Sequence, residues 1–429
     1  MRSDVVVVGA SVAGCTAAML YGRAGLTVTV VEKARDASAF KGLCGHFVLG
    51  GTAAMLRRTG LWDRMVAAGA VAGGIERWTG TGWSVPPADA PEAISLRRER
   101  LDPLLRSVAA GTPGVEIVYG AAVEGLLTEG GRVTGVRTRD GREFRGRLVV
   151  GADGYRSTVA GLADAKTDTA PNNRFGMWAY YRGLSRASNR IWMLEPDVAI
   201  TIRTDDDLTM LVAFPDKARL PAFRADRAGA LESFVAALPD GPDLAGASRV
   251  SPVIGMTDYP CVRRDPTPAP GLVLVGDAAL AGDPQPAVGC GWAFRAAEWL
   301  VLETAPALRG GGGGGGGDGD GDGGGGGGGG GDRTGRPAPA LRVRGDPAER
   351  RALAAYRRRL KFIVAHDRLA RKGALANPPD AVQRLLFRAA TRDPAVAARL
   401  YLLSMRAVPV SAVANPWFLA QAALRAGVR

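Results

Sequence analysis

Residues 4–33 hold the feature that most constrains the fold. Residues 5–8 are all valine, so residues 4–8 predict a buried parallel strand. The pattern from about 13 to 24 predicts a helix that ends at Gly25, and residues 27–31 predict a second strand. A strand, a helix and a second strand within about 30 residues are typical of a β-α-β unit. The sequence therefore predicts an α/β chain that begins with a parallel sheet.

The turn between the first strand and the helix, "GASVAG" at residues 9–14, has the chemistry of a phosphate cradle. Gly9 permits a tight turn, Gly14 lets the helix pack closely on the sheet, and the helix N-terminus offers free N–H groups to a pyrophosphate. Ser11 stands where a dinucleotide fingerprint has a third glycine. Glu32 lies where a carboxylate binds ribose hydroxyls. The alternative is an ordinary strand-to-helix turn that binds no ligand. The position of Glu32, at the expected distance from the glycines, argues against this alternative.

Two later stretches share the design of an apolar strand followed by a carboxylate among small residues. They are "VVGADGYRSTVA" at 149–160 and "GLVLVGDAALAGDP" at 271–284. Such turns bring the backbone close to a ligand and offer one carboxylate each. Either stretch alone is a weak signal, but three such segments in this order are specific.

Composition narrows the function classes further. The net charge is +13, but the basic residues are spread along the chain and only six of the 55 are lysine, so we expect an anionic cofactor or substrate and not nucleic acid. No long unbroken apolar run predicts a membrane span. The four cysteines are scattered without a C-x-x-C pair, which fits a reducing cytoplasm, and no cluster has metal-ligand spacing.

Together the three motifs resemble those of the flavoprotein monooxygenases of the p-hydroxybenzoate hydroxylase type, whose superfamily includes geranylgeranyl reductases and flavin-dependent halogenases. The resemblance covers about residues 1–305. It implies an α/β fold with a Rossmann-like FAD-binding domain, an inserted mixed or antiparallel β-sheet substrate domain and a helical C-terminal region.

The resemblance also implies where FAD binds. The first motif would hold the ADP moiety, Asp153-Gly154 would lie near FAD and assist the nicotinamide donor, and Gly276-Asp277 would bind the ribityl and pyrophosphate. The residues expected to bind the cofactor are Gly9, Ser11, Ala13, Gly14, Glu32, Lys33, Lys41, Cys44, Arg98, Val123, Asp153, Gly276, Asp277, Pro284 and Gly289.

Two further stretches extend the resemblance. "LRRERLDPLL" matches an R-x-x-L-x-x-x-L pattern that would bring Arg98 to the FAD phosphates; the alternative is a solvated arginine at a helix end. "DPQPAVGCGW" follows the third motif, where the family has a glycine-rich turn near the flavin ring. Here the usual Gly-x-Gly is either shifted to residues 289–291 or altered at Ala287.

The stretch "FKGLCGHFV", residues 40–48, resembles the K-x-C-G segment of the reductase and halogenase branches. It would pass beside the isoalloxazine, with Cys44 close to the ring and with Lys41 and His46 placed to polarise flavin or substrate. His46 is the one candidate catalytic residue. The alternative is a loop in which Cys44 is simply buried and His46 caps a neighbouring group.

The resemblance implies a function in which FAD supplies the reactivity. In the hydroxylases, NADPH or NADH reduces FAD, O2 adds at C4a, and the hydroperoxide transfers one oxygen atom. We therefore expect a monooxygenase that hydroxylates or epoxidises an apolar or aromatic small molecule of specialised metabolism. Two alternatives stay open: a reductase of isoprenoid double bonds, and a non-catalytic flavin-binding protein.

The expected domain organisation follows changes in residue pattern and composition along the chain. The cofactor domain is expected to contain helices at 92–110 and from near 291 to 308. It is also expected to contain strands near 115–119, 132–138 and 143–150. Residues 310–331 contain only glycine and aspartate and predict a disordered linker. The expected parts are 1–164 with 261–309 (FAD-binding domain), 165–260 (substrate domain), 310–346 (linker) and 347–429 (helical region).

Overall fold

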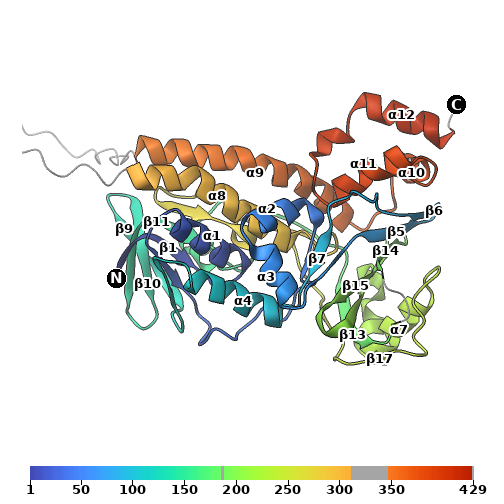
Figure 1. Cartoon of the computed structure of the whole chain (residues 1–429), viewed down its shortest axis with the longest axis horizontal. Coiled ribbons are helices and arrows are strands. Elements are labelled where there is room, and N and C mark those ends of the chain that lie inside the picture. Colours follow the sequence, from blue (N-terminus) through green and yellow to red (C-terminus); the bar gives the residue numbers. More distant parts are fainter. Residues whose placement is uncertain (185–187, 311–345, 428–429) are drawn as a thin grey trace, which may run out of the picture.

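The computed structural model describes residues 1–184, 188–310 and 346–427, and these form a mixed α/β fold with the chain ends at opposite ends of its long axis (Figure 1). The predicted fold class is confirmed. Almost all of the predicted 310–346 linker lies outside the described residues.

The larger part of the molecule is built on a seven-stranded sheet. Its order is β8-β2-β1-β11-β10-β9, and β20 also pairs with β11. Strands β8, β2, β1, β11 and β20 run parallel, whereas β10 and β9 are antiparallel additions. The bounds are Arg2–Val8 (β1), Val28–Val31 (β2), Val115–Val118 (β8), Val123–Glu129 (β9), Arg132–Thr138 (β10), Glu143–Gly151 (β11) and Leu272–Leu274 (β20).

Helices pack on this sheet because their apolar faces are wide. Helix α1 (Val12–Arg23) buries ten of its twelve residues and contacts α4 (Arg98–Ala110) and α8 (Gly289–Gly310). Helix α9 (Pro347–Ala374) lies along α8 in Figure 1. The remaining helices of this part are α2 (Ala53–Arg58), α3 (Leu61–Ala67) and α5 (Thr158–Leu162).

A second sheet forms the other lobe, drawn in green in Figure 1 except for its blue strands β5 and β6. Its order is β17-β13-β16-β15-β14-β5-β6, and β18 pairs with β13. The bounds are Ile75–Thr79 (β5), Gly82–Ser84 (β6), Gly176–Arg182 (β13), Asn189–Met193 (β14), Val198–Thr204 (β15), Leu208–Phe214 (β16), Ser248–Arg249 (β17) and Ile254–Met256 (β18). Strands β5 and β6 come from the segment expected to belong wholly to the FAD-binding domain. The domain division stays a prediction.

Successive side chains of a strand point to opposite faces of the sheet, and in this second sheet both faces carry apolar side chains. On β16, Leu211 and Ala213 pack against α6 (Leu220–Ala225) and α7 (Arg227–Ala236). Met210, Val212 and Phe214 point to the opposite face and join the main core. The second lobe therefore turns one apolar face toward the large sheet.

The other small elements complete the fold. Two three-stranded sheets consist of β3 (Phe47–Val48), β4 (Val71–Gly73) and β7 (Ala93–Ser95), and of β12 (Thr167–Ala170), β19 (Cys261–Arg264) and β21 (Leu280–Ala281). Helices α10 (Ala381–Ala390), α11 (Pro394–Ser404) and α12 (Pro416–Ala426) share a separate small core. The helix predicted over 92–110 is wrong in its first part, because β7 pairs there with β3 and β4 before α4 begins.

Candidate functional site

A cavity of about 710 Å³ lies where the turn before α1, helix α4, the start of α8 and strands β15 and β16 meet. It brings together segments that are far apart in the sequence. The expected site residues that line it are Gly9, Ser11, Ala13, Glu32, Lys33, Lys41, Cys44, His46, Arg98, Val123, Asp153, Asp277, Pro284 and Gly289. Gly14 and Gly276 are not among the lining residues.

The first glycine turn has no room for side chains. Gly9 has a φ of +103°, and a Cβ there would stand 2.6 Å from the carbonyl oxygen of Ala152. A Cβ on Gly14 would collide with the carbonyl oxygen of Gly9. Close approach of strand and helix therefore requires glycine at both positions. The N–H groups of the first turn of α1, which have no partner within the helix, face the cavity side of this turn.

Glu32 and Arg106 fix the backbone of the same turn. One carboxylate oxygen of Glu32 accepts the N–H of Ala10 at 2.6 Å, and the other accepts the N–H of Ala34 at 2.8 Å. Arg106 donates from Nε to the carbonyl oxygen of Ala10 at 2.8 Å. Each carboxylate oxygen of Glu32 keeps a further lone pair for a ligand hydroxyl. The predicted ribose contact of Glu32 stays a prediction that this geometry permits.

Helix α4 presents a polar face to the cavity. Arg98 donates to Ser11 Oγ at 2.7 Å and forms an ion pair with Asp102, and both members of the pair are nearly fully buried. Asp102 also accepts the backbone N–H of Lys41 at 3.0 Å. The alternative of a solvated Arg98 is wrong. Asp102 and Arg106 were missed, although their spacing of four and eight residues from Arg98 places all three on one helix face.

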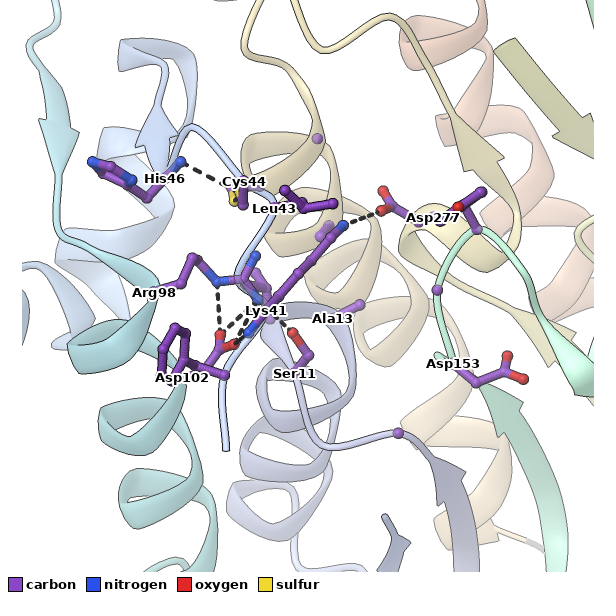
Figure 2. Close-up of a pocket in the computed structure, with 18 of the residues that line it drawn as sticks. Ser11, Ala13, Lys41, Leu43, Cys44, His46, Arg98, Asp102, Asp153 and Asp277 are labelled. Atoms are coloured by element: carbon purple, nitrogen blue, oxygen red, sulfur yellow. Dashed lines mark hydrogen bonds and ion pairs between the residues drawn. The ribbon is translucent and has the colours of Figure 1, made fainter. Parts of the chain in front are cut away.

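Lys41 and Asp277 form an ion pair across the cavity. Figure 2 shows Lys41 reaching from the side of Ser11 and Arg98 to the carboxylate of Asp277, with an Nζ–Oδ2 distance of 3.0 Å. The Asp277 carboxylate raises the pKa of Lys41 above its usual value. Two of the expected cofactor residues, 236 positions apart, therefore meet directly.

Asp153 lies at the cavity but is turned toward its own loop. Its carboxylate accepts the hydroxyl of Ser157 at 2.5 Å and the N–H of Val159 at 3.0 Å, at the start of α5. In Figure 2 it points away from the Lys41–Asp277 pair. The local role of the side chain is to hold this turn, and its predicted cofactor contact stays a prediction.

The other end of the cavity is apolar and contains His46. Cross-strand pairs Ile202–Met210 and Ile200–Val212 of β15 and β16 line it. His46 is 1% exposed, its Nδ1 lies 3.3 Å from the hydroxyl of Tyr180, and burial lowers its pKa to about 4. His46 Nε2 has no hydrogen-bond partner among the described residues. The sequence placed Tyr180 among the aromatic residues of the second lobe that would form a pocket wall, but its contact with His46 was not predicted, because nothing in the sequence places β13 against residue 46.

The turn before α8 bears on the two interpretations of the glycine-rich segment. Ala287 has a φ of +52°, the left-handed region that favours glycine. Gly289 begins α8 and Gly291 lies within it, and neither has a positive φ. The positive φ therefore favours the interpretation that the glycine position is altered at Ala287, which stays a prediction.

The residues fit an FAD molecule. A pyrophosphate requires close approach of the backbone, free N–H groups at a helix N-terminus and a cation. Gly9 and Gly14 leave no space for side chains, the N-terminus of α1 is open, and Arg98 is buried beside it. The cavity volume is within the range of small-molecule and cofactor sites. The unpartnered His46 Nε2 and the apolar strands line the part of the cavity away from these phosphate-binding groups.

Comparison with known proteins supports this assignment. Residues 2–199 match the family model described as FAD binding domain. The chain is 29% identical over 195 residues to aurachin C monooxygenase/isomerase of Stigmatella aurantiaca, covering 44% of this chain and 48% of that protein. It is 30% identical over 175 residues to digeranylgeranylglycerophospholipid reductase 1 of Methanococcoides burtonii, covering 40% and 42%. The match therefore spans about half or less of each of these relatives.

The fold extends further than the sequence match. The structure of the flavin-dependent brominase Bmp2 superposes with a TM-score of 0.75 at 17% identity, covering 98% of this chain and 97% of that chain. The resemblance to flavoprotein monooxygenases, reductases and halogenases is thereby confirmed at the level of the fold and the FAD-binding domain.

Among the helices that the structure describes, none combines the length and the apolar character needed to cross a membrane.

Proposed function

We propose that this chain, whose residues 2–199 match an FAD-binding domain, is an FAD-dependent and NAD(P)H-driven monooxygenase that hydroxylates or epoxidises an apolar or aromatic small molecule. One observation carries the proposal. A single cavity has phosphate-binding features at one end and an apolar wall with one buried histidine at the other. The cavity therefore offers one set of groups to a cofactor and another to a substrate.

The chain's own groups would orient the cofactor. The first turn of α1 and Arg98 would hold the phosphates, Glu32 the ribose, and Asp277 the ribityl chain. Bound FAD would supply electron transfer and the activation of O2. Since Lys41 already binds Asp277, the cofactor would have to share or replace that ion pair.

At the apolar end, His46 would orient the substrate. Its pKa of about 4 keeps the imidazole neutral near neutral pH, so Nε2 can exchange a hydrogen bond with a hydroxyl or amino group of the substrate. The strands β15 and β16 would exclude water and hold the apolar part of the substrate. We therefore expect the substrate to be a mainly apolar molecule that carries at least one polar group.

The nicotinamide donor would bind transiently, because the sequence contains one dinucleotide motif and FAD would occupy it. Reduction by NADPH or NADH and reaction with O2 would then take place at the same cavity. We also propose a cytoplasmic location and a substrate from specialised metabolism.

A spectrum and two rates test this function. Purified protein should be yellow or should take up added FAD, and it should oxidise NADPH or NADH with uptake of O2 that aromatic or isoprenoid compounds stimulate. A His46→Leu variant should keep FAD and lose that stimulation. Protein that neither contains nor takes up FAD would contradict the proposal.

A reductase of isoprenoid double bonds is the second candidate. The observation that favours it is that the segment resembling the K-x-C-G stretch of such reductases lines the cavity, through Lys41, Leu43, Cys44 and Gly45. Double-bond reduction by the FAD-loaded protein under anaerobic conditions would assign the reductase. A protein that binds FAD but shows neither activity would be a non-catalytic flavin-binding protein.

A further inference from the structure

Two thiols that are far apart in the sequence meet at the cavity. Cys44 follows Lys41 in a segment without helix or strand, and Cys290 lies in the first turn of α8. Their sulfur atoms are 3.8 Å apart. A disulfide bond is about 2.05 Å long, so closure needs the two sulfur atoms to approach by roughly 1.8 Å.

The surroundings give the two thiols different roles. A hydrogen bond from Cys290, the cations of Arg98 and Lys41, and the backbone N–H of His46 lower the pKa of Cys44 well below its usual value. The hydrogen bond to Cys44 and burial raise the pKa of Cys290. The thiolate is the nucleophilic form of cysteine. Cys44 is therefore the attacking thiol and Cys290 the resolving thiol.

The other two cysteines provide an internal contrast. Cys15 is 1% exposed and Cys261 is fully buried, and neither lines the cavity. Burial raises the pKa of Cys15 above its usual value and that of Cys261 to about 11. Cys44 and Cys290 both line the cavity. Only a small solute in the cavity has direct access to this pair.

We propose that Cys44 and Cys290 form a redox-active dithiol site whose substrate is a small hydroperoxide, hydrogen peroxide in the simplest case. The Cys44 thiolate attacks one peroxide oxygen, the O–O bond breaks, and hydroxide leaves and takes up a proton to form water. The Cys290 thiol then attacks the sulfur of the Cys44 sulfenic acid, forming the S–S bond as the S–O bond breaks and a second water leaves. The peroxide is reduced to two water molecules, and the two thiols are oxidised to one disulfide, which an external dithiol reduces again.

The test counts thiols by mass, and it does not depend on turnover of any substrate. Full-length protein loaded with FAD is exposed to hydrogen peroxide, alkylated with a maleimide and weighed intact. We expect two of the four thiols to be lost: the alkylated protein should carry two maleimide groups fewer than the reduced protein, and a sample weighed before alkylation should be lighter by about 2 Da with no added oxygen. A linked peptide should join Cys44 to Cys290. Dithiothreitol should restore all four thiols.

Matched variants separate the roles. In Cys290→Ser, oxidation should stop at a Cys44 sulfenic acid that dimedone traps, and in Cys44→Ser the loss of two thiols should disappear. Cys15→Ser and Cys261→Ser should form the same disulfide as the parent. Four thiols left in the parent while a free cysteine peptide in the same tube is oxidised would overturn the proposal. So would a disulfide between any other pair, or oxidation of Cys44 to the sulfinic acid in the parent.

Discussion

The two ends of the cavity are built on different principles. At the end formed by α1, α4 and Asp277, charged groups are paired with one another: Arg98 with Asp102, and Lys41 with Asp277. At the end formed by β15 and β16, apolar side chains surround a histidine whose Nε2 is unpartnered among the described residues. We refer to these as the charged end and the apolar end.

The contrast teaches where rigidity and adaptability lie. The buried pair of Arg98 and Asp102 cannot be separated without leaving an unpaired buried charge, so this pair is fixed before a ligand binds, whereas the partly exposed pair of Lys41 and Asp277 can rearrange. Apolar side chains tolerate changes of similar volume at small cost. The charged end is therefore suited to one cofactor, whereas the apolar end can change specificity with few substitutions.

The largest expected effect comes from breaking the buried pair of the charged end. Arg98→Met leaves the carboxylate of Asp102 buried without its cation, which is expected to lower the free energy of unfolding by about 3–5 kcal/mol. FAD affinity should fall as well, because the arginine beside Ser11 is lost. Urea unfolding of the FAD-free chain and titration of FAD fluorescence measure the two effects.

A double variant separates stability from cofactor binding. Arg98→Met combined with Asp102→Leu removes both charges, and most of the lost stability should return. FAD affinity should stay low, since the cation remains absent. If the double variant bound FAD as the parent does, Arg98 would have only a structural role.

The second effect concerns the pair that spans the cavity. Asp277→Ala removes the partner of Lys41 and the expected ribityl contact, and should weaken FAD binding roughly 30-fold, about 2 kcal/mol. Asp140→Ala is a matched control, because Asp140 also pairs with a cation, Arg142, but at an exposed site away from the cavity. Equal FAD dissociation constants for both variants would show that the third motif is misassigned.

The sequence predicted the charged end well because its chemistry restricts residue types. Gly9 and Gly14 are required by close contact of backbone atoms, and Asp277 follows an apolar strand in a turn of small residues. These constraints are local, so they can be recognised in one sequence. The ion pair between Lys41 and Asp277 was not predicted, although both residues were, because its partners are 236 positions apart.

The contacts of His46 and Cys44 could not be predicted from the sequence, because they also join residues that are far apart along the chain. Tyr180 reaches His46, and Cys290 reaches Cys44, only through the packing of distant segments. The strands β5 and β6 join the second sheet through parallel pairing of β5 with β14, which no periodicity in residues 75–84 indicates. Long-range pairing and not local propensity determines this lobe.

A pH series sharpens the contrast, because neutral His46 belongs to the apolar end. Its pKa is about 4 in the folded chain, against an ordinary value of 6.5. Between these values the unfolded chain binds more protons, so stability is present above about pH 6.5 and is lost as pH falls toward about 4, by up to about 1.4 kcal/mol per pH unit. His46→Phe should reduce this slope in urea unfolding.

The comparison with the parent isolates His46 from other buried groups. Burial also lowers the pKa of His366 to about 4, so part of this slope remains in His46→Phe and should decrease further when His366 is replaced too. Asp283, whose pKa burial raises, acts in the opposite direction but equally in the parent and the variant. An unchanged slope in His46→Phe would mean that the pKa of His46 is not lowered in the folded chain.

The smallest expected effect lies at the turn where the two ends meet. Ala287 holds a left-handed backbone that is strained for an L residue and free of strain for glycine, while glycine loses more entropy on folding. Ala287→Gly should therefore change the free energy of unfolding by less than about 1 kcal/mol, toward greater stability, and leave FAD affinity within twofold. Ala287→Val is the matched opposite, because a β-branched residue is least tolerant of positive φ, and it should lower stability by more than the glycine raises it. If Ala287→Val were neutral, the turn would adapt freely, and the start of α8 would belong with the adaptable end of the cavity and not with the fixed one.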